Sequence, residues 1–269
     1  MPDGAETAGT LFRAGKLGEA IDAAGAAVRK APTDLGARVL LAELLLAGGN
    51  LERADVILDA ASEADPAAAV VIAEFRQLLR AEMARRQLRR DGRVPEFLGE
   101  PGEPERAELA ALVALRGGDL AEAARQAQAA EAARPRAPGM LAGKPIDDFR
   151  DADDLTAGFF EVLTTTGKYF WIPTGRVESL QFHPPKRARD LIWRRASMSV
   201  QDGPDGEVYL PATYASDEPD LSAALRLGRE TEWHELAPGL VRGVGQRVFL
   251  AGDEAVGIMD LTELSFAAA

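Results

Sequence analysis

A short pattern recurs three times in the first half of the chain. Residues 15–20, with the sequence Gly-Lys-Leu-Gly-Glu-Ala, are matched by residues 49–54 and by residues 118–123. The equivalent leucines are separated first by 34 and then by 69 positions, which is one period and about two periods. A repeat of this length forms one pair of helices, which cannot bury its apolar face alone. The pattern therefore predicts helix pairs stacked side by side.

The repeat resembles the tetratricopeptide repeat. The small and proline positions of that family are occupied in two successive units, by Ala20, Ala27 and Pro32 and by Ala54, Ala61 and Pro66. Arg38 stands where the family carries a large aromatic residue, so the repeats are degenerate. The resemblance implies a tetratricopeptide-like α-α superhelix at the N-terminus.

A longer apolar segment interrupts the period between residues 67 and 93. Its apolar residues have helical spacing, so we expect one long helix. Five arginines lie on or near the side of this helix that is opposite its apolar residues: Arg80, Arg85, Arg86, Arg89 and Arg90. They indicate either a solvated basic face or a groove for an acidic partner helix.

The composition changes after a last predicted helix pair, at 105–117 and 120–134. Pro135, Pro138 and Gly139 form a linker. Beyond it, β-branched and aromatic runs predict strands at 159–164, 167–173, 176–182, 195–200 and 207–212. Segments 241–250 and 255–261 can close the same sheet. The expected fold is therefore multidomain, with a helical repeat domain over 1–138 and an α+β domain with an antiparallel sheet over 139–269.

An acidic run at residues 147–154 raises the question of a metal site. A calcium loop that began at Asp151 would need Gly and Glu where Thr156 and Val162 stand. We therefore expect no metal here, and interpret the run as a helix start or as a source of salt bridges between the domains.

Charge argues against a nucleic-acid partner. The net charge is -12, with 18 basic and 22 acidic residues before Gly139 and 13 and 21 after it, so neither half has a basic footprint. The chain has no Cys, no apolar run of membrane-spanning length and no apolar leader at its acidic N-terminus. We expect a cytoplasmic protein without a membrane partner.

The residue inventory offers little for catalysis. There are two His residues and no Cys, and no Gly-x-Ser-x-Gly elbow, so neither a hydrolase triad nor a three-histidine zinc site is expected. The sequence predicts no enzyme and no cofactor. A carboxylate-based hydrolase and a self-assembling scaffold remain alternatives to an adaptor.

Aromatic and basic residues are concentrated between Gly167 and Arg195. Aromatic and arginine side chains are common interface hot spots, so the candidate protein-binding residues are Tyr169, Trp171, Arg187, Arg189, Trp193 and Arg194. The competing interpretation is that the tryptophans belong to the core. A third possibility is that Arg187 or Arg194 reaches the acidic run at 147–154.

Four motifs in order resemble the ImpE/TagJ family of type VI secretion accessory proteins. They are residues 167–173 (Gly-Lys-Tyr-Phe-Trp-Ile-Pro), residues 184–194, residues 206–214 and residues 243–254. The resemblance implies a cytoplasmic, non-enzymatic adaptor without a cofactor. It also implies binding to a helix of the small contractile-sheath subunit and, indirectly, an influence on the AAA+ ATPase that disassembles the sheath.

Overall fold

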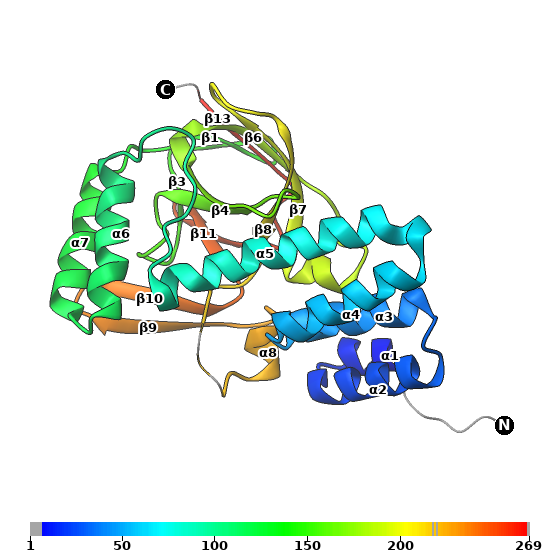
Figure 1. The fold of residues 1–269 in the computed structure, drawn as a ribbon. Coiled ribbons are helices and arrows are strands. Elements are labelled where there is room, and N and C mark those ends of the chain that lie inside the picture. Colours follow the sequence, from blue (N-terminus) through cyan, green and yellow to red (C-terminus); the bar gives the residue numbers. More distant parts are fainter. Residues whose placement is uncertain (1–6, 217, 219, 268–269) are drawn as a thin grey trace.

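The protein combines a stack of helices with antiparallel sheets (Figure 1). The computed structural model describes residues 7–216, 218 and 220–267. Residues 1–6, which contribute to the expectation that no leader is present, lie outside the described residues.

Among the described residues, seven helices precede the first strand, and they include the helix pairs that the repeat predicts. They are α1 (Ala8–Arg13), α2 (Leu17–Lys30), α3 (Leu35–Ala47), α4 (Leu51–Ala64), α5 (Ala69–Asp91), α6 (Glu103–Arg116) and α7 (Leu120–Ala133), and a 3-10 turn, η1 (Pro66–Ala68), precedes α5. The predicted tetratricopeptide-like region and the long helix in its middle are confirmed.

The recurring glycine has a conformational role. Gly15, Gly49 and Gly118 open the three copies of the pattern, and their φ angles are 81°, 82° and 79°. Left-handed backbone of this kind favours glycine. In all three copies a helix starts two residues after this glycine. In two of them the first turn of that helix is capped by the side chain of Asn50 or Asp119. The pattern is therefore a turn between paired helices.

The C-terminal part is built on one antiparallel sheet of eight strands. Their order is β2-β1-β13-β6-β7-β8-β4-β5. The strands are β1 (Gly139–Leu141), β2 (Lys144–Ile146), β4 (Phe159–Leu163), β5 (Tyr169–Pro173), β6 (Val177–Phe182), β7 (Trp193–Val200), β8 (Gly206–Pro211) and β13 (Glu263–Phe266). Two 3-10 turns, η2 (Thr174–Arg176) and η3 (Ala188–Leu191), and the short helix α8 (Ala223–Arg226) connect strands.

Five further strands form two small sheets. One is β9 (Thr231–Ala237) with β10 (Leu240–Gly245), and the other has the order β12-β11-β3, with β12 (Glu254–Gly257), β11 (Val248–Ala251) and β3 (Phe149–Asp151). The expectation that 241–250 and 255–261 close the main sheet is wrong. Gly245, with a φ of 94°, ends β10, so the predicted single strand is split between the two small sheets.

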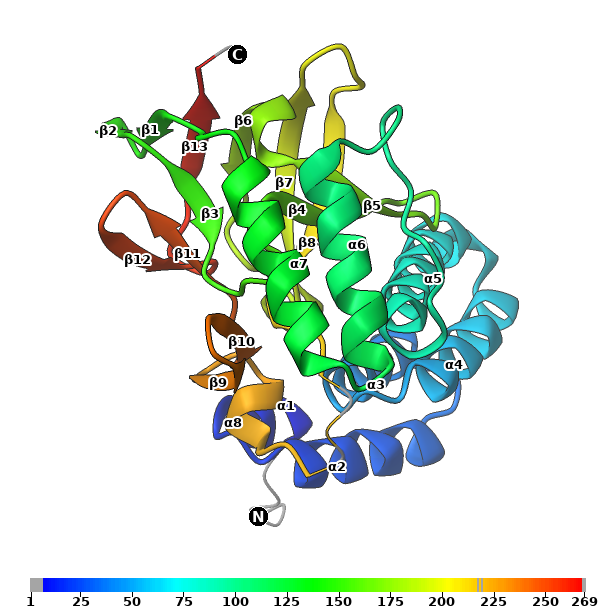
Figure 2. The ribbon, with the colours of Figure 1, turned by 90° about the vertical axis from the view of Figure 1, so that its left-hand side faces the viewer.

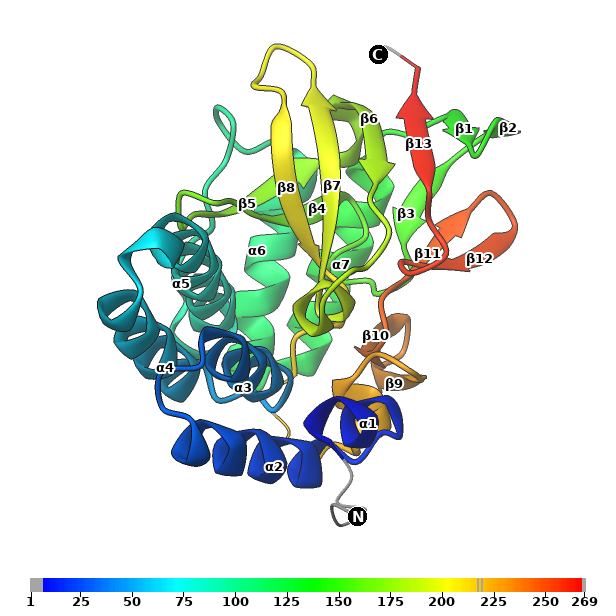
Figure 3. The same cartoon turned by 90° about the vertical axis from the view of Figure 1, so that its right-hand side faces the viewer.

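The helices and the main sheet share one apolar core. Figures 2 and 3 show α6 and α7 covering one face of the sheet, with α1 to α4 beside its end. One buried cluster contains Leu41, Phe75 and Leu112 from the helices together with Trp171 and Trp193 from the sheet. A second cluster, around Phe160 and Phe249, lies between the main sheet and the sheet of β3. The last helix before the strands, α7, ends at Ala133, and the first strand, β1, starts at Gly139. That residues 138 and 139 separate two domains stays a prediction.

Candidate functional site

Five of the six predicted contact residues lie inside the protein. Tyr169, Trp171 and Trp193 are 1–2% exposed, and Arg189 and Arg194 are also buried. Arg187 alone is exposed. The expected aromatic and basic surface is therefore not formed, because strands β5 and β7 pack their side chains beneath α5.

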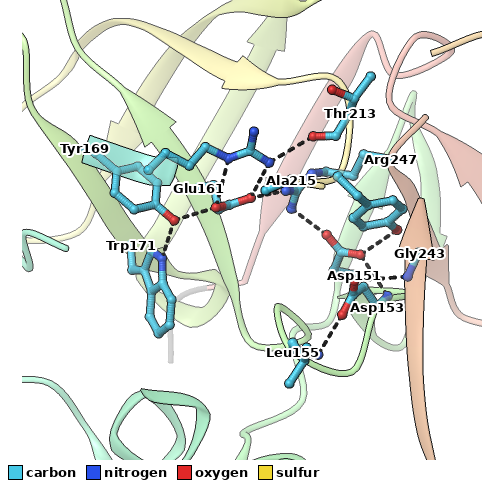
Figure 4. A network of polar contacts seen from close by, with 12 residues as sticks. Asp151, Asp153, Leu155, Glu161, Tyr169, Trp171, Thr213, Ala215, Gly243 and Arg247 are labelled. Atoms are coloured by element: carbon cyan, nitrogen blue, oxygen red, sulfur yellow. Dashed lines mark hydrogen bonds and ion pairs between the residues drawn. The ribbon is translucent and has the colours of Figure 1, made fainter. Parts of the chain in front are cut away.

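Tyr169 and Trp171 belong to a buried polar network (Figure 4). The indole N–H of Trp171 donates to the Tyr169 hydroxyl at 2.6 Å, and this hydroxyl donates to Glu161. The Trp171 ring stacks on Phe159 with 3.8 Å between the ring centroids. Both residues thus have internal partners for their polar and apolar groups.

Glu161 is the centre of this network. Arg85 on α5 donates to both of its carboxylate oxygens at 3.0 Å, and Arg247 donates to it as well. Burial opposes the charge of Glu161, but the two guanidinium groups outweigh it and hold its pKa below the usual range. Arg247 also donates to Asp151 at 2.6 Å.

The network corrects the solvated-face interpretation for one of the five arginines on the long helix, Arg85. Arg85 is not on a solvated face, because it is buried and crosses from α5 to Glu161 on strand β4. Together with Arg86 and Arg89 it lines a small pocket, so the groove interpretation stays a prediction. Arg86 donates to the carbonyl of Gly49 at 2.8 Å and is half-buried. Arg80 and Arg90 are exposed, as a solvated face requires.

The remaining predicted residues are also held by internal contacts. The Trp193 indole donates to Glu82 at 3.2 Å, and the Arg189 guanidinium lies 4.9 Å from the centroid of the Phe75 ring. Arg194 donates to the carbonyls of His183 and Leu261 at 2.6 and 3.2 Å.

The acidic run at 147–154 pairs with other arginines than those expected. Asp148 bonds Arg134 at 2.7 Å, and Asp154 bonds Arg150 at the same distance. The proposed contacts with Arg187 or Arg194 are therefore not formed. The run does not start a helix, because its central residues form β3, but Asp148 does link the helical part to the sheet part.

A groove opens beside Arg187, between the helices and the loop that precedes η3. Its volume is about 620 Å³. We call it the α3–α5 groove, and it is lined by Leu35, Gly36, Val39, Leu40 and Glu43 of α3, by Ala68, Val71 and Ile72, and by Lys186, Arg187 and Ala188. Most of these residues are apolar. Val71 is 49% exposed and the adjacent Val70 is 81% exposed, so two apolar side chains face solvent at the start of α5.

The rim of the groove is basic and is fixed by one carboxylate. The backbone N–H groups of Lys186 and Arg187 donate to Asp190 at 2.8 and 3.0 Å. Both basic side chains are exposed, and within the described residues neither forms an ion pair. An acidic partner would therefore find two free positive charges next to an apolar surface.

Glu43 lies among the apolar residues of the groove and is only 5% exposed. Burial raises its pKa to about 7, although the nearby Arg189 and Arg187 favour its ionised form. Sequence reasoning missed this residue. Its signal is a single acid within the otherwise apolar run from Val39 to Ala47.

His183, Ser197 and Glu207 lie together but are not arranged as a hydrolase triad. Nε2 of His183 lies 3.0 Å from Ser197 Oγ, but Glu207 contacts the same ring nitrogen at 3.3 Å. A catalytic triad needs the carboxylate on the other nitrogen, where it orients the ring. Among the residues that the structure describes, no three His, Cys, Asp or Glu side chains are placed to hold a metal ion. Nor is any described helix both long enough and apolar enough to cross a bilayer.

Comparisons with known proteins agree with the motifs. A model of the ImpE protein family matches residues 143–265, and a tetratricopeptide repeat model matches residues 11–74. The chain is 34% identical over 256 residues to the type VI secretion system accessory component TagJ of Pseudomonas aeruginosa, which covers 95% of this chain and 89% of that protein. The chain belongs to the ImpE/TagJ family.

A solved structure shows the same fold over the whole length of this ImpE/TagJ protein. The crystal structure of protein VPA1032 from Vibrio parahaemolyticus matches with a TM-score of 0.91 at 26% identity, and the match covers 97% of each chain. The arrangement of helices and sheet described above is therefore shared with a distant relative.

We expect Arg85→Met to destabilise this ImpE/TagJ protein by about 3 kcal/mol. The change leaves the buried Glu161 with one cation in place of two, and breaking a buried ion pair typically costs about 3–5 kcal/mol. Urea unfolding measures the difference. Arg80→Met, at an exposed position of the same helix, is the control and should change stability little. Equal stability of the two variants would contradict the role given to Arg85.

We expect Glu43→Gln to stabilise the protein more at pH 8 than at pH 5. The pKa of Glu43 is about 7 in the folded protein against 4.5 as the ordinary value, so the folded state loses stability as the pH rises between these values and keeps that penalty above pH 7. Glutamine removes the penalty, which is about 3 kcal/mol at pH 8. The measurement is chemical unfolding at both pH values, with the exposed Glu52→Gln as control. A gain for Glu43→Gln that is the same at both pH values would contradict the burial of a charge.

Proposed function

We propose that this chain is a non-enzymatic adaptor of the type VI secretion system that binds a helix of the small contractile-sheath subunit in the α3–α5 groove. The observation that carries the proposal is the open apolar groove with a basic rim. Insertion of an amphipathic helix into an apolar groove is a common mode of peptide recognition. The family of the chain and the name of its Pseudomonas relative support the secretion context.

The chemistry of the groove suits one face of such a helix. Leu35, Val39, Leu40 and Val71 offer apolar contact. Full burial of such a side chain contributes roughly 1.5–3 kcal/mol, and each of these contributes a part of that, because three are already half-buried and Val71 is 49% exposed. Lys186 and Arg187 stand out against the net charge of -12 of the chain. A partner helix with an apolar stripe and acidic residues on one flank therefore matches the groove in both respects.

Two further aspects of the proposal follow from the family. By holding the sheath subunit, the adaptor affects the handling of the sheath by the AAA+ disassembly ATPase, and it does so in the cytoplasm. Catalysis has no part in this role. Glu207 contacts the same ring nitrogen of His183 as Ser197 does, so the three side chains are not arranged as a catalytic triad, which supports a role without hydrolysis.

The proposal predicts that Val71→Asp weakens binding of a labelled peptide of the N-terminal helix of the small sheath subunit at least tenfold. A carboxylate in the groove is desolvated on binding and repels an acidic partner. Val56→Asp is the matched control, because Val56 is 66% exposed on α4 and does not line the groove. Fluorescence anisotropy at two salt concentrations measures both variants, and Arg187→Ala should lower the salt dependence.

Three results would contradict the proposal. The first is no binding of the peptide at about 100 μM, where a weak specific contact still registers. The second is an equal loss of affinity for Val71→Asp and Val56→Asp. The third is a dimer in sedimentation that Val71→Asp converts to a monomer, since the groove would then be filled by a second copy of a self-assembling scaffold.

A further inference from the structure

The α3–α5 groove contains a hydrogen-bonding group that the protein itself leaves unused. The carboxylate of Glu43 accepts a hydrogen bond from the backbone of Ala188, but its Oε1 atom is buried and has no hydrogen-bond partner among the described residues. Buried polar atoms of folded proteins nearly always have a partner, so an exception calls for a physical explanation. Glu43 is also one of the residues that line the groove, whose other α3 residues are apolar or glycine.

Arg189, close to the rim residue Arg187, also has buried polar atoms without a hydrogen-bond partner. Nε and Nη1 of Arg189 are buried without an acceptor. The same guanidinium lies over the Phe75 ring and 3.6 Å from Glu74, which itself accepts a hydrogen bond from Tyr209 at 2.9 Å. These contacts hold Arg189 in place without pairing it to Glu43, so its charge acts on the carboxylate without satisfying Oε1.

The surrounding charges restrict what can satisfy Glu43. Arg187, Arg189 and Asp190 act on its carboxylate, and Lys186 lies on the same rim. These groups add three positive charges and one negative charge around one acid. A further cation from a partner would be repelled by them, whereas a neutral hydroxyl or amide can donate a hydrogen bond at no such cost.

We propose that the α3–α5 groove selects a helix that carries one neutral hydrogen-bond donor, a hydroxyl or an amide, in the middle of its apolar stripe and acidic residues on the flank that faces Lys186 and Arg187. The donor bonds Oε1 of Glu43 and fixes the register of the helix in the groove. A single buried polar residue sets register in this way in coiled coils. The inference rests on one part of the proposed function, namely that a helix binds in the groove. It does not depend on which protein supplies that helix.

The proposal explains selectivity as well as attraction. A helix with leucine at the central position would fill the groove but would leave Oε1 of Glu43 buried and unpaired. A site built to hydrogen-bond a polar group discriminates strongly against an apolar analogue, because its own polar group then stays unpaired. We expect at least a tenfold preference for the polar helix.

The test is a panel of synthetic amphipathic helices of about 18 residues, or five turns. The peptides are identical except for Gln, Ser or Leu at the centre of the apolar stripe, and each is made with an acidic or a lysine flank. Anisotropy titrations use the full chain and its Glu43→Leu and Glu43→Gln variants. Glu52→Leu, at an exposed position of α4 outside the groove, is the matched control. Thermal unfolding shows that each variant is folded.

The unmodified protein should bind the acid-flanked Gln and Ser peptides at least tenfold more tightly than the Leu peptide. Glu43→Leu should reverse this order, Glu43→Gln should keep it because its amide oxygen still accepts, and Glu52→Leu should leave it unchanged. Equal or tighter binding of the Leu peptide to the unmodified protein would overturn the proposal, as would a preference for lysine flanks or no binding by any acid-flanked peptide. Failure of the sheath-subunit peptide alone, with the panel behaving as expected, would overturn only the proposed function.

Discussion

The structure depends on the pairing of a buried carboxylate with cations from two distant segments. Glu161 on β4 is held by Arg85 of the long helix α5 and by Arg247, which follows β10. A charge buried in the interior is strongly unfavourable unless it is paired and hydrogen-bonded. The position of α5 against the sheet is therefore tied to the position of Glu161 within it. Tyr169 and Trp171 extend the same network into the apolar core.

The candidate site lies at the other end of the same long helix. The first turn of α5 supplies Val71 and Ile72 to the α3–α5 groove, and the loop that enters η3 supplies its basic rim. The helices contribute one wall and the sheet part contributes the other, so the groove exists only while the two parts stay docked. A preformed groove reduces the cost of ordering that binding would otherwise require. Interaction surfaces of helical repeats generally arise from such stacking of neighbouring units.

Sequence reasoning predicted the elements better than their surroundings. The 34-residue period located the helix pairs because Gly49 and its equivalents mark turns that need a left-handed residue. Aromatic and β-branched runs located β4 and β5. The sequence pattern did not predict whether Trp171 and Arg85 are buried, because the pattern of a strand or a helix face does not specify which other element packs against it. Glu43 was missed for the opposite reason, since one acid in an apolar run gains meaning only when the groove around it is seen.

The most direct test of the account is amide hydrogen exchange of the full chain with and without the helix peptide of the small sheath subunit. Slowed exchange in residues 35–43, 68–72 and 186–188, which line the α3–α5 groove, is the expected result. The exchange of β9 and β10, far from the groove in the fold, should not change (Figure 1). Protection confined to β9 and β10, or no protection at saturating peptide, would contradict the claim that this groove is the docking site.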